Sequence, residues 1–109
     1  MPHDEVLPDC GSICRILTTA TDREPLFLGK PKPAMVELAL RRTGFAPEQA
    51  VIIGDRLYTD IACGVNAGID SIFVLSGEGT EADIAQHGIH PTWIFSDIAA
   101  LYRQLEETL

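Results

Sequence analysis

The most informative stretch of the chain is VIIGDRLYTDI, residues 51–61. A short apolar run is followed by Gly54 and the carboxylate of Asp55, and a second carboxylate, Asp60, comes five residues later. A strand that ends in Gly-Asp places its carboxylate at the carboxyl edge of a sheet, where ligands bind in open α/β folds. Two carboxylates in one loop suit Mg2+, which takes one or two protein oxygens and completes its shell with waters and phosphate.

The composition restricts the class of protein. The chain has 109 residues, enough for one domain, and a formal net charge of −8, which disfavours nucleic acid and anionic membrane surfaces as partners. No apolar run approaches the roughly 20 residues of a membrane span, and the first residues lack a signal-peptide pattern. Three cysteines without a CxxC pair predict reduced thiols. We therefore expect a cytoplasmic protein.

Apolar periodicity predicts strands and helices that alternate along the chain. Strands 26–28 and 71–75 are expected to be buried, and Ile61 and Val65 to face the core. Trp93 is expected in the core or against the last helix. This alternation is typical of an α/β fold with a parallel sheet. Strands are predicted over 26–28, 50–54, 71–75 and 92–95, and helices over 13–20, 34–43, 60–67 and 81–87, with a last helix after residue 96.

Helix starts are predicted from residues whose side chains accept backbone N–H bonds. Thr59 is expected to cap the helix over 60–67, and Ser96 to cap the last helix. Thr80 is expected to cap the helix over 81–87, with Asp83 completing a capping box.

Each candidate metal ligand has a structural alternative. Asp55 is either a ligand at a strand end or a turn aspartate that accepts nearby N–H groups. Asp60 either supports a metal site or stabilises a helix start, where the dipole favours an acid, and one side chain can do both.

The remaining candidates lie in two loops. Lys30, between Gly29 and Pro31, can hold the negative charges of a nucleophile and a phosphate together, or it is a solvated loop lysine. Lys32 is interpreted as solvated. Candidate substrate contacts come from backbone N–H groups and the Thr59 hydroxyl, although capping is the favoured role for that hydroxyl. The loop residues concerned are Arg56, Leu57, Tyr58 and Thr59.

The ordered set of motifs resembles the haloacid dehalogenase (HAD) superfamily, and within it the NagD-like branch, subfamily IIA. The motifs are GKPKPAM at 29–35, VIIGDRLYTDI at 51–61, GVNAGIDSIFVLSG at 64–77 and PTWIF at 91–95. PDCGSICRIL at 8–17 resembles the end of that branch's cap domain. The resemblance implies a three-layer, Rossmann-like parallel sheet flanked by helices. It also implies that residues 1–28 are the end of the cap with its return segment, and that 29–109 are the C-terminal part of the core.

The resemblance further implies a Mg2+-dependent phosphatase that hydrolyses phosphomonoesters through an aspartyl-phosphate. Its substrates would be small, such as sugar phosphates, nucleotide monophosphates or p-nitrophenyl phosphate. By the same resemblance, Lys30 steadies the nucleophile and phosphate, Asp55 binds Mg2+, and Asp60 supports the metal site and the catalysis. Residues 56–59 would contact substrate.

The sequence departs from the family in one large respect. The family's nucleophile lies in a DxDGT-like motif on the first core strand, and this chain contains no DxD. The chain therefore resembles a C-terminal portion, and we expect it to be inactive alone. In this family the nucleophile strand lies beside the strand that precedes Asp55. Without it, strand 50–54 would present an open edge, which predicts a homodimer, a domain swap or poor solubility.

Two other functions remain open. One is a non-catalytic binding or protein-interaction module, in which Lys30, Asp55 and Asp60 persist as a weak site for Mg2+ and phosphate. A receiver-like domain phosphorylated on Asp55 is disfavoured, because such domains carry an acid pair near their first strand and none is visible.

Overall fold

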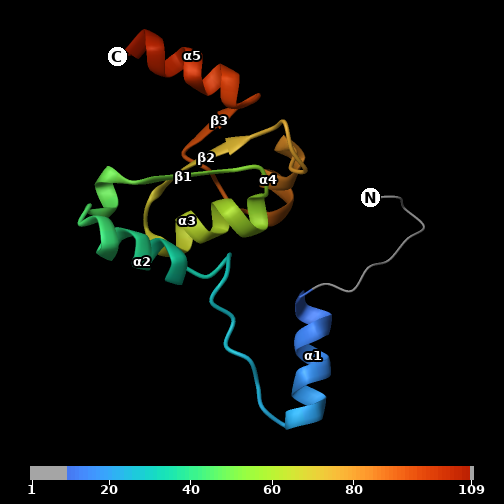
Figure 1. Cartoon of the computed structure of the whole chain (residues 1–109). Helices are drawn as coiled ribbons and strands as arrows, with labels where there is room; N and C mark the ends of the chain where they lie inside the picture. Colours follow the sequence, from blue (N-terminus) through green and yellow to red (C-terminus); the bar gives the residue numbers. More distant parts are fainter. Residues whose placement is uncertain (1–9, 109) are drawn as a thin grey trace.

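The sheet at the centre of the molecule has three parallel strands. In this computed structural model, which describes residues 10–108, they are β1 (Val51–Gly54), β2 (Asp70–Val74) and β3 (Trp93–Phe95), in the order β1-β2-β3 (Figure 1). Ile53 pairs with Ile72, and Phe73 with Ile94. The predicted α/β fold with a parallel sheet is confirmed.

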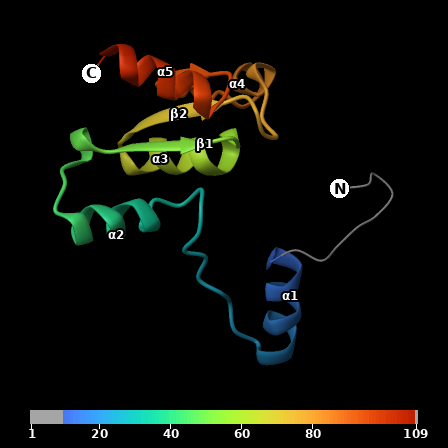
Figure 2. The same ribbon diagram turned by 45° about the horizontal axis from the view of Figure 1, so that its top comes forward.

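Helices cover both faces of the sheet (Figures 1 and 2). A π-helical turn, η2, runs directly into α3 and packs with it on one face, and α5 packs on the other. No helix among residues 10–108 is long and apolar enough to cross a membrane. The helices are α1 (Cys10–Thr21), α2 (Ala34–Thr43), η1 (Pro47–Gln49), η2 (Leu57–Ile61), α3 (Ala62–Ala67), α4 (Glu81–His87) and α5 (Ile98–Thr108).

The buried core follows the alternation of side chains along β2. Phe73 points to the η2 face, where it is fully buried with Leu57 and Ile61. Ile72 and Val74 point to the opposite face, and both pack with Leu101 of α5. The central strand is therefore covered on both sides, as its continuous apolar sequence predicts.

The N-terminal helix stands apart from the sheet in both views (Figures 1 and 2). The apolar stripe of this helix, Ile13, Ile16 and Leu17, is exposed: Ile16 keeps 67% of its surface and Leu17 57%. The radius of gyration is 16.7 Å, against about 13 Å for a compact domain of this length. The helix prediction is correct, but the stripe has no core to face within residues 10–108.

The predicted strand over 26–28 is wrong. These residues lie in the irregular connection between α1 and α2, and Leu26 is 78% exposed. A strand exists only where a neighbouring strand accepts its hydrogen bonds. The sheet of the described chain ends at β1, so an apolar triplet outside it has no such neighbour.

Two helix-start predictions are also wrong. Thr59 lies inside the η2 turn and not at a cap, because the helical segment already begins at Leu57. The last helix is capped by Asp97 and not by Ser96: Asp97 Oδ1 accepts the Ala100 N–H at 2.7 Å. At the third start, one half of the predicted capping box is confirmed: Asp83 Oδ2 accepts the Thr80 N–H at 2.9 Å, whereas the Thr80 side chain makes no capping hydrogen bond.

Burial corrects one further prediction, for Val65, and decides between the two alternatives for Trp93. Ile61 is fully buried, as expected, but Val65 is 52% exposed because it lies on the solvent side of α3. Trp93 is about half exposed and lines a groove beside α5, together with Leu105. It lies against the last helix and not in the core.

The assignment of Asp97, and not Ser96, as the cap of α5 can be tested directly. We expect Asp97→Ala to lower the free energy of unfolding by about 1 kcal/mol, because the Ala100 N–H loses its acceptor. Ser96→Ala is the matched control and should change stability by less than about 0.5 kcal/mol, since Ser96 is exposed. Urea unfolding followed by circular dichroism measures both. Equal losses in the two variants would contradict the assignment.

Candidate functional site

The candidate site lies at the carboxyl ends of β1 and β2. Because the two strands are parallel, the loops that follow them meet at one edge of the sheet. The Gly79 N–H donates to the Asp55 carbonyl at 2.9 Å, so the loop after β2 is hydrogen-bonded to the loop after β1. A Cβ on Gly77 would lie 2.0 Å from Asp55 Oδ2, so only glycine allows this approach. The backbone after β2 thus forms a wall beside the Asp55 carboxylate.

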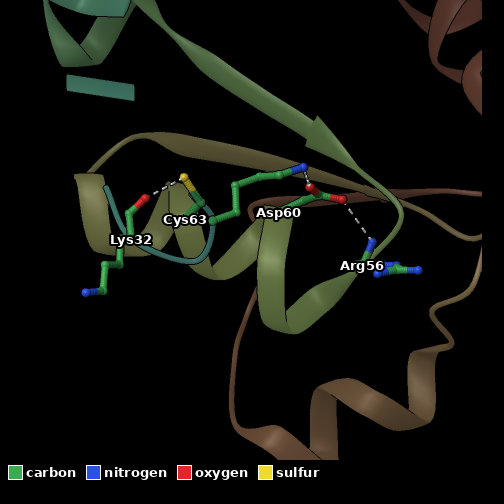
Figure 3. Close-up of polar contacts among 5 residues, drawn as sticks. Lys32, Arg56, Asp60 and Cys63 are labelled. Carbon is green, nitrogen blue, oxygen red and sulfur yellow. Dashed lines mark hydrogen bonds and ion pairs between the residues drawn. The ribbon is translucent and has the colours of Figure 1, made fainter. Parts of the chain in front are cut away.

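Asp60 is the most buried charge of the site, with 7% of its surface exposed. Its Oδ1 forms an ion pair with Nζ of Lys30, and its Oδ2 accepts the Arg56 backbone N–H at 3.3 Å (Figure 3). Gly54 makes room for it, since a Cβ there would lie 2.2 Å from the Asp60 Cβ. The structure therefore brings Lys30 and Asp60 together across 30 residues of sequence.

The Asp55 carboxylate is placed differently. Among the described residues it accepts no hydrogen bond, and it is half-buried at the end of β1. Nowhere in residues 10–108 do three or more His, Cys, Asp or Glu side chains gather in a metal-binding group. A carboxylate that accepts no hydrogen bond, five residues before a second that is already paired, fits Mg2+, which keeps several waters and takes few protein oxygens.

The loop residues 56–59 divide into three kinds. Arg56 Nη2 binds Glu78 Oε2 at 2.8 Å, and this hydrogen bond raises the pKa of the guanidinium further. Leu57 has a fully buried side chain, so only its backbone is available to a ligand. Tyr58 is exposed, with its ring centroid 6.1 Å from that of His87. Thr59 is half-buried within the π-helical turn, a feature often found at functional sites.

Sequence reasoning missed four contributors. Gly77 and Glu78 are not among the candidates above, although their position after the next parallel strand places them at the same edge as Asp55. Cys63 and Asn66 donate to backbone carbonyls of the loop that carries Lys30. No local pattern predicts those two contacts, because they span 31 and 35 residues of sequence.

Comparison with known proteins fits this geometry. The model of the HAD-hydrolase-like family matches residues 27–101, which include the Lys30 loop and the whole sheet. The chain belongs to the haloacid dehalogenase superfamily. The similar curated proteins, which include NagD, support the NagD-like branch of this superfamily. That branch is a family of hydrolases whose relatives here are phosphatases.

Two curated relatives and two solved structures illustrate the match. The dihydroxyacetone phosphatase of Corynebacterium glutamicum is 40% identical over 88% of this chain and 35% of its own length. Ribonucleotide monophosphatase NagD of Escherichia coli K12 is 37% identical over 86% of this chain and 38% of its own. The 4-nitrophenylphosphatase of Thermotoga maritima superposes with a TM-score of 0.77, at 40% identity over 89% of this chain and 38% of that one. A glycerol phosphate phosphatase of Mycobacterium tuberculosis, in complex with magnesium, gives a TM-score of 0.76, at 37% identity over 92% of this chain and 31% of that one.

The coverage values show how much of each relative is matched. The HAD chain spans little more than a third of the length of the curated relatives, 35% of one and 38% of the other.

The glycine that makes room for Asp60 gives the next prediction. Gly54→Ala should lower the free energy of unfolding by about 1–3 kcal/mol, because its Cβ meets the Asp60 Cβ and neither atom can rotate away. Gly29→Ala is the control: its Cβ would meet nothing within 4 Å, and it should be neutral or stabilising by about 0.4–1 kcal/mol. Urea unfolding distinguishes them, and an unharmed Gly54→Ala variant would refute the close approach.

Proposed function

We propose that the chain is the C-terminal part of a Mg2+-dependent HAD-type phosphatase that hydrolyses small phosphomonoesters through an aspartyl-phosphate. The observation that carries this proposal is the pairing of Lys30 with Asp60 in the segment that follows β1 and Asp55, within the part of the chain that matches the family. In this proposal residues 1–28 end the cap domain, and 29–109 form the C-terminal part of the core.

Mg2+ would be held by Asp55 directly, while Asp60 supports the site through the residues around it. The free Asp55 carboxylate is the better ligand, because both Asp60 oxygens already have partners. When bound, Mg2+ would neutralise charge on the phosphate oxygens. The magnesium complex of the mycobacterial relative supports the choice of ion.

Lys30 would be a catalytic residue by virtue of its charge. Its ammonium is partly exposed, with 42% of the side chain accessible, although one side of it contacts Asp60. The opposite side can therefore face a phosphate and the attacking carboxylate, whose like charges repel each other. A fixed cation between them lowers that repulsion where charge develops in the reaction. Asp60 holds the cation in place.

The loop after Asp55 would bind the substrate. Backbone N–H groups of residues 56–59 and the Thr59 hydroxyl are the proposed donors, and Leu57 contributes only through its backbone. The pairing of Arg56 with Glu78 fixes one end of this loop. The substrate would be a small phosphorylated molecule, and the protein would act in the cytoplasm without a nucleic-acid or membrane partner.

The isolated chain should not turn over substrate, because no DxD nucleophile is present in its sequence. A chimera tests the proposed roles directly. Its N-terminal part comes from the Thermotoga maritima 4-nitrophenylphosphatase, and residues 27–101 of this chain replace the matching segment. We expect Mg2+-dependent hydrolysis of 4-nitrophenyl phosphate by the chimera. Lys30→Ala or Asp55→Ala should lower kcat about 100-fold or more.

Lys32→Ala is the matched control in the chimera, because Lys32 lies in the same loop and forms no ion pair among the described residues. It should leave kcat within about twofold of the parent. A folded chimera that stays active after Lys30→Ala would contradict the catalytic role. Mg2+-dependent turnover by the isolated chain, abolished by Asp55→Ala, would contradict the need for a separate nucleophile.

The open edge of β1 would drive self-association. Within the described chain β1 pairs only with β2, and Val51 and Ile53 are 46% and 45% exposed. Unpaired backbone groups beside exposed apolar side chains form a template for another strand. We expect a homodimer or a domain-swapped dimer of the isolated chain, measured by light scattering after size exclusion at roughly 100 μM.

Ile53→Lys places a charge on the edge strand and should return the chain to a monomer. Val65→Lys is the control, since Val65 is equally exposed but lies on α3, away from the edge. A wild-type monomer at this concentration would refute association through β1.

A further inference from the structure

Two side chains of α3 bind the backbone of the loop that carries Lys30. Cys63 Sγ donates to the Lys32 carbonyl at 3.3 Å (Figure 3), and Asn66 Nδ2 donates to the Pro31 carbonyl at 2.9 Å. We propose that Cys63 and Asn66 are positioning residues that hold the loop over residues 29–33 so that Lys30 meets Asp60. The proposal rests on the catalytic role of Lys30 proposed above and adds the part of the fold that keeps it there.

The loop needs such support because its own backbone forms few hydrogen bonds. Pro31 and Pro33 have no N–H to donate. The Lys32 N–H donates within the loop, to the Gly29 carbonyl at 3.1 Å. Residues 22–28, which precede the loop, belong to no helix or strand. Segments with few internal bonds and exposed backbone open easily. Within residues 10–108, the two bonds from α3 are the side-chain hydrogen bonds that join this loop's backbone to the folded core.

The two donors suit this task because α3 is fixed to the sheet. Cys63 and Asn66 are three positions apart and therefore share one face of the helix. Gly64, next to Cys63, lets α3 lie close to β1: a Cβ there would be 2.5 Å from the Ile52 Cγ2. Both donors therefore project from a helix that is packed tightly against the sheet.

The two donors differ in burial, and each carries a proton that it can donate at neutral pH. Cys63 is fully buried, and burial raises the pKa of its thiol, so that the S–H proton remains in place to donate at neutral pH. Asn66 is exposed, and its amide remains a donor at every pH. Asp60 lies in η2, which continues into α3 without a break. One helical segment therefore positions both partners of the Lys30–Asp60 pair.

The test uses the whole 109-residue chain and nitrogen NMR of the Lys30 ammonium at one fixed, mildly acidic pH. The contact with Asp60 should slow the exchange of its Nζ protons with water. Asn66→Asp keeps the shape of the side chain but cannot donate from an ionised carboxylate, and Cys63→Ala removes the other donor. We expect exchange about fivefold faster in each variant and roughly 25-fold faster in the double variant. Cys63→Ser restores an O–H donor and should retain slow exchange.

Val65→Ala is the matched control on the exposed side of the same helix, and it should leave the Lys30 signal unchanged. The backbone amide signals of β1 and β2 report whether each variant keeps its fold. Unchanged Lys30 exchange in a folded double variant would overturn the proposal. Equal acceleration in Val65→Ala, or in Cys63→Ser, would also overturn it, because both retain the two donors. This experiment uses no metal or substrate. A negative result would therefore refute the positioning role alone, and the comparison of Lys30→Ala with Lys32→Ala in the chimera would still test the proposed function.

Discussion

The close approach of the helical segment over 57–67 to strand β1 is the constraint on which the site depends. Gly54 admits the Asp60 side chain, and Gly64 admits Ile52, at distances that no Cβ would tolerate. This approach buries Asp60 against the sheet, and a carboxylate so buried needs polar partners. Lys30 and the Arg56 N–H supply them, so the packing of one helix on one strand determines where the cation lies.

The same structure carries apolar surface that its own core does not cover. The α1 stripe, the β1 edge and the Ile98 side of α5 are all exposed, while the two small clusters around β2 are tightly buried. The asymmetry agrees with the match to little more than a third of the length of the curated relatives. The site has the same character: the Asp60 carboxylate is paired, and the Asp55 carboxylate accepts no hydrogen bond among the described residues.

Sequence patterns predicted the features that depend on neighbouring residues. The alternation of elements, the buried β2 strand and the bond from the Thr80 N–H to Asp83 follow from local periodicity and propensity, and the structure bears them out. Strand 26–28 failed because strand formation depends on a partner elsewhere in the chain. Ser96 and Asp97 are adjacent residues that cap helices equally well, so only the backbone path decided between them.

The family and the candidate residues can be predicted from the sequence alone, because the order of the motifs and the carboxylates at strand ends are local features of the chain. How those residues meet depends on the tertiary structure. The Lys30–Asp60 pair and the bonds from Cys63 and Asn66 join residues 30 to 35 positions apart. The wall that Gly77 forms beside Asp55 depends on two loops meeting at one sheet edge. Such contacts are set by strand order and helix packing, which no local pattern encodes.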